Sequence, residues 1–438
     1  MIGIDLWTDK SCAVCLLDGT YYIVPKTDAH ALDKEKTFTQ KLSYCRYAAQ
    51  EWLEAPVQGA VITVPDGFDL LQRQAVLDAG KAAGFGQVRL LGESAATALV
   101  WGRRQTREGK EAFFLACALS GHNLSLCVAD AGDNMVEIVD CAALEFYPAL
   151  GWTPDMERAV QRMIDFKKPE FALVTGDAAA NQDIIAALER LTGEALSPTN
   201  PKSSYLAMGA AALGAVLDWS EKDLLLLDAL PWGLWLQTGK DTAEMVFDRT
   251  TTIPSKAVKP VSRDTQSELC LLQKGRTVRE LRWEELVPAG WKEDEAQISF
   301  TVEADGQLNV RFEESENKPK PSETPAEPPP AKQAGAKETI LALLPVYDNL
   351  ERAVRQETAD AAYKKGVEMT MAQLKKVLLQ LGVTEIDALG KPFDPNFHNA
   401  VMHIEDGSFG KNIVSRVYQA GFMMDNKVIR FAAVEVAN

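Results

Sequence analysis

The sequence lacks the features of a secreted or membrane-spanning protein. Asp5 interrupts the first apolar stretch and no cleavage-site pattern follows, so we expect no signal peptide. The longest apolar run, residues 206–217, is too short to cross a bilayer. The seven cysteines are scattered and odd in number, which is typical of a reducing compartment. These absences predict a cytoplasmic protein without a membrane partner.

Excess positive charge is also missing. With 46 basic and 62 acidic residues the net charge is −16, which argues against binding to a nucleic-acid backbone. A CxxC motif, Cys12 to Cys15, lies on a predicted strand, where the odd spacing points the two thiols to opposite faces. We therefore interpret both cysteines as apolar fillers and predict no metal site. The length of 438 residues suffices for roughly two to four domains.

Residues 1–220 alternate strand-forming and helix-forming segments in an order that occurs twice. The expected strands are 2–6, 12–17, 21–24, 60–64, 88–91, 113–119, 124–129, 135–139 and 171–174. The expected helices are 32–53, 69–83, 95–101, 154–166, 181–191 and 203–217. The repeated order of three strands, a helix, a strand and a helix predicts two α/β lobes facing each other across a ligand-binding cleft.

Three further segments follow these lobes. Residues 221–228 carry the run LLLLD and look like an exposed connector, although an apolar strand docked in a core is the better-supported interpretation. Residues 229–315 predict a β-sandwich, because β-branched and alternating residues recur between turn signals. Its expected strands include 267–272, 297–302 and 308–312. Residues 316–337 are rich in proline and lack large apolar residues, which predicts a solvated, semi-rigid linker.

Two helices with apolar stripes are expected within residues 338–390, at 338–355 and 363–381. Neither helix can bury its stripe alone, so an intrachain hairpin and a four-helix bundle made by two chains are both open. The stripe residues are Ile340, Leu343, Leu344, Tyr347, Leu350, Val354, Val367, Met371, Leu374 and Leu378. Residues 391–438 predict a small β-domain, with a turn at Asp394-Pro395-Asn396 and strands at 401–404 and 427–436.

Several stretches, in order along residues 1–315, resemble DnaK-type heat-shock chaperones. They are IGIDLWTDKSCAV from residue 2, VITVPDGFDLLQRQAVLDAGKAAG at 61–84, LLGESAATALVWG at 90–102, NPKSSYLAMGAA at 200–211 and EADGQLNV at 303–310. The resemblance implies an actin-like ATPase-type fold with a nucleotide between its lobes, followed by the family's peptide-binding β-sandwich. The helical lid that follows the sandwich in that family has no counterpart here.

The resemblance fails at the nucleotide site. Trp7 stands at a glycine position of the first phosphate-binding turn, and the second turn, residues 118–123, keeps one glycine and no acid. Bare backbone is what lets N–H groups approach phosphate closely. The interval 25–34 leaves no room for the subdomain that carries the family's catalytic lysine. We therefore predict no catalytic residue and a loss of ATP hydrolysis, with ATP or ADP binding left open. The remnants of the nucleotide site are Asp5, Thr8, Glu93, Gly121 and Gly176.

Two C-terminal stretches, FDPNFHNAV at 393–401 and GFMMDNKVIRFAAVEV at 421–436, resemble GrpE, the nucleotide exchange factor of DnaK-type chaperones. The resemblance implies that the stripe residues named above form a homodimer and that a β-domain contacts the chaperone. The implied contact residues are Phe393, Asp394, Pro395, His398, Ala400, Val401, Gly421, Ile429 and Arg430. As a lone histidine, His398 is more typical of a core or turn residue than of a base. Phe431 stands at a proline position of the family, and the family's long helix ahead of residue 338 is missing.

The expected partner is a second molecule. In the family, GrpE grips a lobe inserted in the second repeat, but only residues 167–170 separate Phe166 from Phe171 here. We therefore predict a co-chaperone, an exchange factor or adaptor that acts in trans on a DnaK-type chaperone in protein folding and the stress response. Two alternatives stay open: an ATP-binding chaperone with residual ATPase activity and peptide binding, and a nucleotide-independent holdase.

Overall fold

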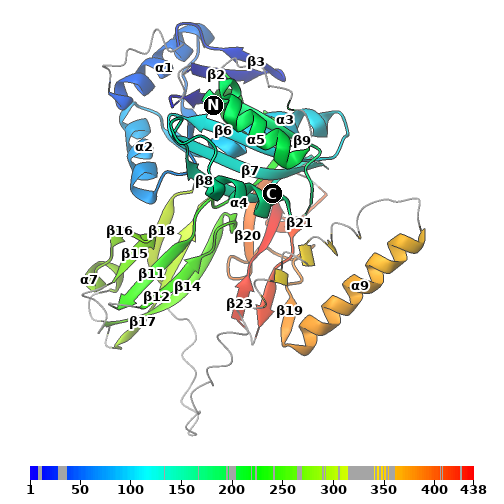
Figure 1. Ribbon diagram of the computed structural model, residues 1–438. Coiled ribbons are helices and arrows are strands. Elements are labelled where there is room, and N and C mark those ends of the chain that lie inside the picture. The colour runs from blue at the N-terminus through cyan, green and yellow to red at the C-terminus, as the bar shows by residue number, and fades with distance from the viewer. Residues whose placement is uncertain are drawn as a thin grey trace. The chain divides into compact units, whose positions relative to one another are not determined.

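The computed structural model describes most of the chain. It leaves undescribed residues 8–11, 28–36, 133, 166, 194–195, 197–203, 219, 222–223, 240–241, 264–268, 289–290, 292, 304–305, 314–339, 341–342, 345–346, 349, 352–353, 355–360, 405, 407 and 425–426. The chain divides into two compact units, residues 1–314 and 315–438, which are treated separately below (Figure 1). Within the described residues, no helix is both long and apolar enough to span a membrane.

The first lobe is built on a five-stranded sheet in the order β3-β2-β1-β4-β5. Its strands are β1 (Ile2–Asp5), β2 (Cys12–Leu17), β3 (Thr20–Ile23), β4 (Gly59–Val64) and β5 (Gln87–Gly92). β4 runs parallel to both of its neighbours and is buried along its whole length, as expected for a strand covered on both faces. α1 (Phe38–Leu53) and α2 (Leu70–Ala82) cover one face, and capping boxes at Thr37 and Asp69 begin them.

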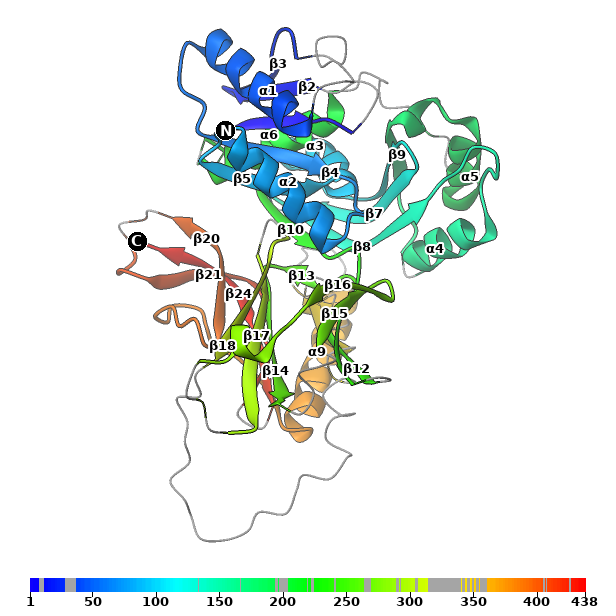
Figure 2. The same ribbon diagram turned by 90° about the vertical axis from the view of Figure 1, so that its left-hand side faces the viewer.

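The second lobe has a six-stranded sheet in the order β13-β10-β8-β7-β6-β9. Four of its strands are β6 (Ala112–Ser120), β7 (Asn123–Gly132), β8 (Met135–Glu145) and β9 (Phe171–Gly176). α4 (Pro154–Ile164) and α5 (Gln182–Thr192) cover one face of this sheet (Figure 2). On the other face lie α3 (Glu93–Arg107) and α6 (Tyr205–Leu217), which separate the two sheets.

Glycines let α6 approach its neighbours at backbone distance. A Cβ atom on Gly3 of β1 would collide with the carbonyl oxygen of Ala207 in α6. In the same way, a Cβ atom on Gly209 would collide with Ala96 in α3. α6 also buries the β2 residues Cys12 and Val14. This helix therefore covers the face of the first sheet that α1 and α2 leave open.

Each lobe runs three strands, a helix, a strand and a helix, which is the order that the sequence predicts. Several helices begin or end at other residues than the sequence predicts. α3 is longer than the predicted 95–101, because Glu93 begins it and polar residues continue it to Arg107. The predicted helix 32–53 falls partly outside the described residues, and its described part begins at Phe38. The assignment to the actin-like fold stays a prediction.

The expected connector is a strand of the second lobe's sheet. β10 (Leu225–Ala229) runs parallel to β8 and pairs on its other side with β13 (Thr252–Ile253). Leu224 and Leu227 are buried. The expectation of an exposed connector is wrong, because both edges of β10 pair with neighbouring strands and alternate residues of the strand, Leu225, Leu227 and Ala229, are buried. The alternative interpretation, a strand docked in a core, agrees with the structure.

The rest of the first unit is a β-sandwich of two antiparallel sheets. One has the order β12-β11-β15-β16 and the other β14-β17-β18. Their strands are β11 (Leu234–Gly239), β12 (Thr242–Phe247), β14 (Ser255–Ser262), β15 (Cys270–Gln273), β16 (Arg276–Glu280), β17 (Glu295–Val302) and β18 (Leu308–Glu313), with α7 (Trp283–Leu286) between β16 and β17. Trp232, Leu236 and Phe300 lie fully inside the shared core. The sequence-based expectation of a β-rich domain here therefore agrees with the structure.

The second unit combines two helical segments with two small sheets. Those residues of 340–354 that the structure describes are helical, and α9 (Ala361–Gln380) follows, lying beside β19 (Figure 1). One sheet contains β19 (Val383–Glu385), β22 (Phe422–Met424) and β23 (Lys427–Arg430), and the other contains β20 (His398–Ile404), β24 (Ala432–Ala437) and β21 (Ile413–Gln419). The single strand predicted at 427–436 is wrong: Phe431 separates β23 from β24, which belong to different sheets.

Candidate functional site

The end of β1 carries a buried carboxylate whose donors come from the chain itself. Asp5 Oδ1 accepts the backbone N–H of Trp7 at 3.2 Å and the hydroxyl of Thr63 at 3.0 Å. The Trp7 indole donates to the carbonyl oxygen of Thr63 at 2.5 Å. Its ring stacks on Phe38 with 4.9 Å between centroids and meets Phe68 edge-on at 4.8 Å. The first turn is thus held by internal contacts, and Trp7 packs against the core of its own lobe.

Glu93 opens α3 and is fully buried. Its carboxyl accepts the hydroxyls of Ser120 at 2.5 Å and Ser125 at 3.3 Å, from β6 and β7. Burial raises the pKa of Glu93 well above its usual range, and the nearby negative charges of Asp5 and Asp66 raise it further. A carboxyl held in its neutral form is a poor base for an attacking water and a poor ligand for Mg²⁺.

The second turn, between β6 and β7, already holds an anion from the chain. Gly121 has a φ of +60°, and its N–H donates to Asp177 Oδ2 at 3.3 Å. Asp177 opens the short 3₁₀ helix η1 (Asp177–Ala180) directly after Gly176, whose φ is +63°. A carboxylate at this amide repels a phosphate that would use the same donor.

The structure brings four of the five predicted remnants into this region. Asp5 and Glu93 belong to one buried electrostatic group, and Gly121 and Gly176 lie next to Asp177. Thr8 lies outside the described residues. Sequence reasoning missed Ser120, Ser125, Asp66 and Asp177, because no motif marks a hydroxyl or carboxyl that faces inward from a turn. Among the described residues, no group of three or more His, Cys, Asp or Glu is arranged to hold a metal ion.

In the second unit, the FDPNFH stretch forms a turn closed by its own residues. Asp394 Oδ1 accepts the N–H of Asn396 at 2.8 Å, and the Asp394 N–H donates to His398 Nδ1 at 3.1 Å. The His398 N–H returns to the Asp394 carbonyl oxygen at 2.8 Å. Burial lowers the pKa of His398, so the imidazole stays neutral and its Nδ1 acts as an acceptor. His398 is therefore a turn residue, as the sequence suggests.

Arg430 links the β-domain to the helical segment. Its guanidinium makes a two-pronged ion pair with Asp348, at 2.6 and 2.7 Å, and also donates to the carbonyl oxygen of Ala420. It lies 5.1 Å from the ring centroid of Phe422. A Cβ atom on Gly421 would collide with the backbone of Ala432, so the chain needs glycine there. These two motif residues brace the domain from within.

The other predicted contact residues differ in exposure. Pro395 and Ala400 are exposed, Phe393, Asp394, Val401 and Ile429 are half-buried, and His398 and Gly421 are buried. The turn and strand β20 therefore carry the accessible part of the predicted surface. Whether it contacts a chaperone stays a prediction.

The predicted dimerisation stripe is largely buried within the single chain. Ile340, Leu344, Tyr347, Met371 and Leu378 pack with Val383 and Phe422 of the adjoining sheet, with Leu350, Val354 and Leu374 around them. Val367 is half-buried, and Leu343 is 41% exposed. Most of the stripe is therefore covered within one chain, as in the intrachain alternative, and not by a second copy. Val377, Leu379 and Leu381 add exposed apolar side chains near the end of α9.

Two family models match different parts of the chain. Residues 14–142 match the family model described as Hsp70 protein, and residues 305–438 match the GrpE model. Protein GrpE of Clostridium beijerinckii is 53% identical over 96 residues, covering 22% of this chain and 46% of that protein. The same-named proteins of Lachnoclostridium phytofermentans and Staphylococcus carnosus are 47% identical over 109 residues and 42% over 97, covering 24% and 22% of this chain and 49% of each relative. The chain spans about half the length of these curated relatives.

Proposed function

Because the chain joins a segment that matches Hsp70 chaperones to one that matches GrpE, we propose that it is a co-chaperone that exchanges adenine nucleotides on a separate DnaK-type chaperone. The observation that carries the proposal is the match over residues 305–438, in which the motif residues build a braced β-domain with an accessible turn and strand. Protein folding and the stress response, in the cytoplasm, are the setting that this role implies.

Exchange by such a domain needs no catalytic side chain. A rigid surface that binds the open form of a chaperone's nucleotide cleft more tightly than the closed form shifts the equilibrium toward opening. ADP then leaves faster. The internal bonds of Asp394, His398 and Arg430 supply that rigidity, since each holds a turn or strand in one geometry.

The first unit is proposed to be a degenerate body that does not hydrolyse ATP. Its turn donors are bound to Asp5 and Asp177, and Glu93 lies buried and neutral. Residues 165–170 alone connect α4 to β9, so the lobe that a GrpE protein is expected to grip has no place there. These observations favour action in trans.

Homodimer formation belongs to the same proposal. Leu343, Val377 and Leu381 leave apolar surface on the helices even though the main stripe is covered. Two copies packed through these side chains would bury that surface.

Release of a fluorescent ADP from an intact DnaK-type chaperone tests the function. The full chain is expected to accelerate release, and an Ala400→Arg variant should lose most of this effect, because it adds a long charged side chain to the exposed part of β20. Ala75→Arg, at an exposed position of α2, is the matched control and should behave like the wild type. No acceleration by the wild-type chain would overturn the proposal.

A second function, a holdase for unfolded peptides, rests on one face of the sandwich. Trp235 of β11 and Met245 of β12 are direct cross-strand partners and are 39% and 37% exposed. An aromatic and a thioether side chain together suit extended apolar peptide. Suppression of client aggregation without nucleotide, lost in a Trp235→Ser, Met245→Ser variant, would support this function. Equal suppression by the variant would contradict it.

A further inference from the structure

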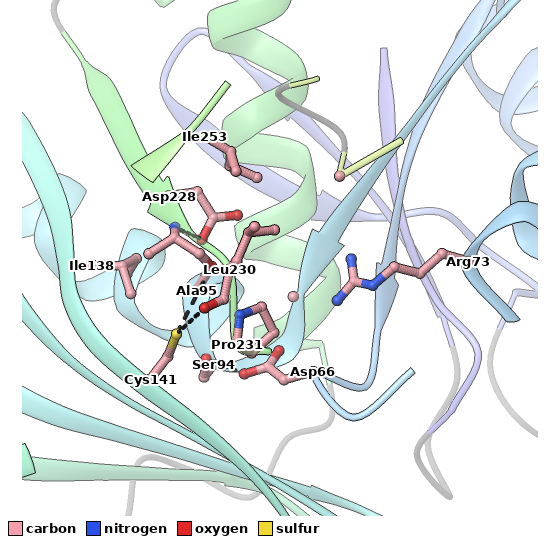
Figure 3. Close-up of a pocket in the computed structure, with 13 residues that line it drawn as sticks. Asp66, Arg73, Ser94, Ala95, Ile138, Cys141, Asp228, Leu230, Pro231 and Ile253 are labelled. Atoms are coloured by element: carbon pink, nitrogen blue, oxygen red, sulfur yellow. Dashed lines mark hydrogen bonds between the residues drawn. The ribbon is translucent and has the colours of Figure 1, made fainter. Parts of the chain in front are cut away.

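The outer edge of the first sheet offers more contact surface than the pocket beside the connector strand. That pocket, drawn in Figure 3, has a volume of about 20 Å³, which is room for about one water molecule. β3 ends the strand order β3-β2-β1-β4-β5, so its outer side pairs with no strand among the described residues. At this edge Leu17, Tyr22 and Ile23 are 41%, 44% and 53% exposed.

β3 lacks the residues that usually protect an exposed strand edge. Its sequence, TYYI, contains no charged side chain and no proline. Other edge strands of the same unit do contain them: Arg89 in β5, Glu244 in β12, Lys259 and Pro260 in β14, Arg279 in β16 and Arg311 in β18. Charges and prolines at an edge keep a further strand from pairing there. β3 is therefore open to pairing.

The backbone of β3 turns hydrogen-bonding groups toward this open edge. The Val24 N–H donates to the carbonyl oxygen of Ala13 at 2.9 Å, which marks a bonded pair between the two strands. Bonded and non-bonded positions alternate in an antiparallel ladder, so Tyr22 is also bonded to β2. The N–H and C=O groups of Tyr21 and Ile23 consequently point away from β2.

Both faces of the edge are apolar. Tyr22 lies on the face that α1 covers, with its ring centroid 5.9 Å from that of Trp52. Ile23 lies opposite Val14, which packs with α6 on the other face. An added strand would therefore meet apolar side chains on both faces and backbone partners at Tyr21 and Ile23.

We propose that β3 pairs with β3 of a second copy of this chain, antiparallel and about a two-fold axis at Tyr22. An axis perpendicular to the sheet keeps the same face of both copies on the same side. Tyr22 then lies opposite Tyr22 of the other copy. Tyr21 of each copy exchanges two backbone hydrogen bonds with Ile23 of the other. This register satisfies the edge groups of both strands at once.

Charge complementarity identifies a second copy as the occupant. The chain has a net charge of −16, so two copies repel each other unless the surfaces that meet are neutral or complementary. β3 is neutral, and the antiparallel register brings the exposed Asp18 before each strand beside the exposed Lys26 after the other. Two four-residue strands bury less than the roughly 800 Å² per partner of a standard interface, so this dimer should dissociate on dilution.

Sedimentation of the full chain over a dilution series tests the pairing. The wild-type mass should rise with concentration to about twice that of a Tyr22→Lys variant. Tyr22→Lys places two ammonium groups opposite each other at the axis and should weaken association at least about tenfold. Tyr47→Lys, at a 66% exposed position of α1, is the matched control and should associate like the wild type.

The charge pair has a separate test. Lys26→Glu places a carboxylate beside Asp18 of the other copy and should weaken association by roughly threefold or more. Lys81→Glu, at an exposed position of α2, changes the net charge by the same amount and should leave association nearly unchanged. Equal weakening by the two variants would contradict the proposed register.

A cysteine at the axis reports the register directly. Opposite residues at a non-bonded position lie about 4.5 Å apart between Cα atoms, within the range of a disulfide. Tyr22→Cys should therefore give covalent dimers on mild oxidation with copper ions and dissolved oxygen, whereas Tyr47→Cys and the wild-type chain should give few.

Three results would overturn the pairing through β3. One is a wild-type mass that does not change with concentration. The second is association that Tyr22→Lys leaves unchanged, which would assign the contact to the helices of the second unit instead. The third is equal cross-linking of the Tyr22→Cys and Tyr47→Cys variants. None of these readouts depends on ADP release, so they are independent of the proposed exchange function.

Discussion

The interlobe region of the first unit and the β-domain of the second both use their motif residues internally, but with opposite consequences. In the lobes, Asp5 and Gly121 are bound to Trp7 and Asp177, so the groups that would meet a ligand are occupied. In the β-domain, Arg430 is occupied in the same sense, yet its ion pair fixes the position of a surface formed by other residues. If the proposed function holds, the same kind of internal bonding closes a small-molecule site in the lobes and fixes the shape of a docking surface in the β-domain.

The largest expected effect is the loss of the Arg430 ion pair. Arg430→Met leaves Asp348 partly buried without its partner and should destabilise the second unit by about 3 kcal/mol. Arg416→Met, at an exposed position of the same domain, is the control and should cost under about 1 kcal/mol. All tryptophans of the chain precede residue 292, so hydrogen exchange of β22 to β24 is the suitable measurement. Equal losses for both variants would remove the argument for a braced β-domain.

A somewhat smaller effect is expected at Gly421. Gly421→Ala forces its methyl group against the Ala432 backbone and should cost about 2 kcal/mol. Gly410→Ala meets only ordinary contact with Ile413 and serves as the control, with a change within about 0.5 kcal/mol. Urea unfolding followed by circular dichroism measures both. If Gly421→Ala leaves the free energy of unfolding unchanged, the close approach of Ala432 in β24 does not require glycine at position 421.

In the lobes, by contrast, replacing one buried polar residue, Glu93, should stabilise the first unit. Glu93→Gln removes a carboxyl whose pKa is raised by burial, so the wild-type free energy of unfolding should fall as the pH rises above about 4.5, and the variant should lose that part of the slope. At pH 8 we expect the variant to be more stable than the wild type, read from tryptophan fluorescence in urea. Glu51→Gln, exposed on α1, should change neither stability nor slope. A destabilised Glu93→Gln variant at pH 8 would mean that the carboxyl still has a charged role.

The smallest effect belongs to Asp177. Asp177→Asn weakens the bond to the exposed N–H of Gly121, and stability should change by less than about 0.5 kcal/mol. Because Trp7 and Glu93 stay as they are, calorimetry with ATP and Mg²⁺ should still detect no tight binding by this variant. Tight binding would show that one internal anion, rather than the whole set of internal bonds, closes the site.

Buried strands were the most predictable part of the fold. β4 and β6 are buried along their whole length and almost entirely apolar, so the sequence marks them as strands whichever neighbours they pair with. The break at Phe431 was not predictable, because the residues on both sides favour strands and only pairing with different sheets separates them. The connector was ambiguous for a similar reason, since its apolar run fits either an exposed linker or a docked strand.

Of the candidate sites, the sequence revealed the degraded turns but not what replaced their ligands. Trp7 and the single glycine at 121 are visible as departures from a pattern. The internal anion at Asp177 and the hydrogen bonds of Glu93 to Ser120 and Ser125 depend on contacts between residues far apart in the chain. Such contacts follow from tertiary packing, which single-sequence periodicity does not encode.

The position of α6 has a consequence for synthesis. Its residues, 205–217, cover β1 and β2 at the start of the chain, with Ala207 and Ala211 against Cys12 and Val14. Until the ribosome has synthesised α6, no helix packs against that face of the first sheet. At typical translation speeds about 10 to 40 s pass between the synthesis of β1 and that of α6. During this time the apolar residues on one face of β1 and β2 stay exposed to solvent. The N-terminal sheet therefore cannot bury both of its faces until residue 217 has been synthesised.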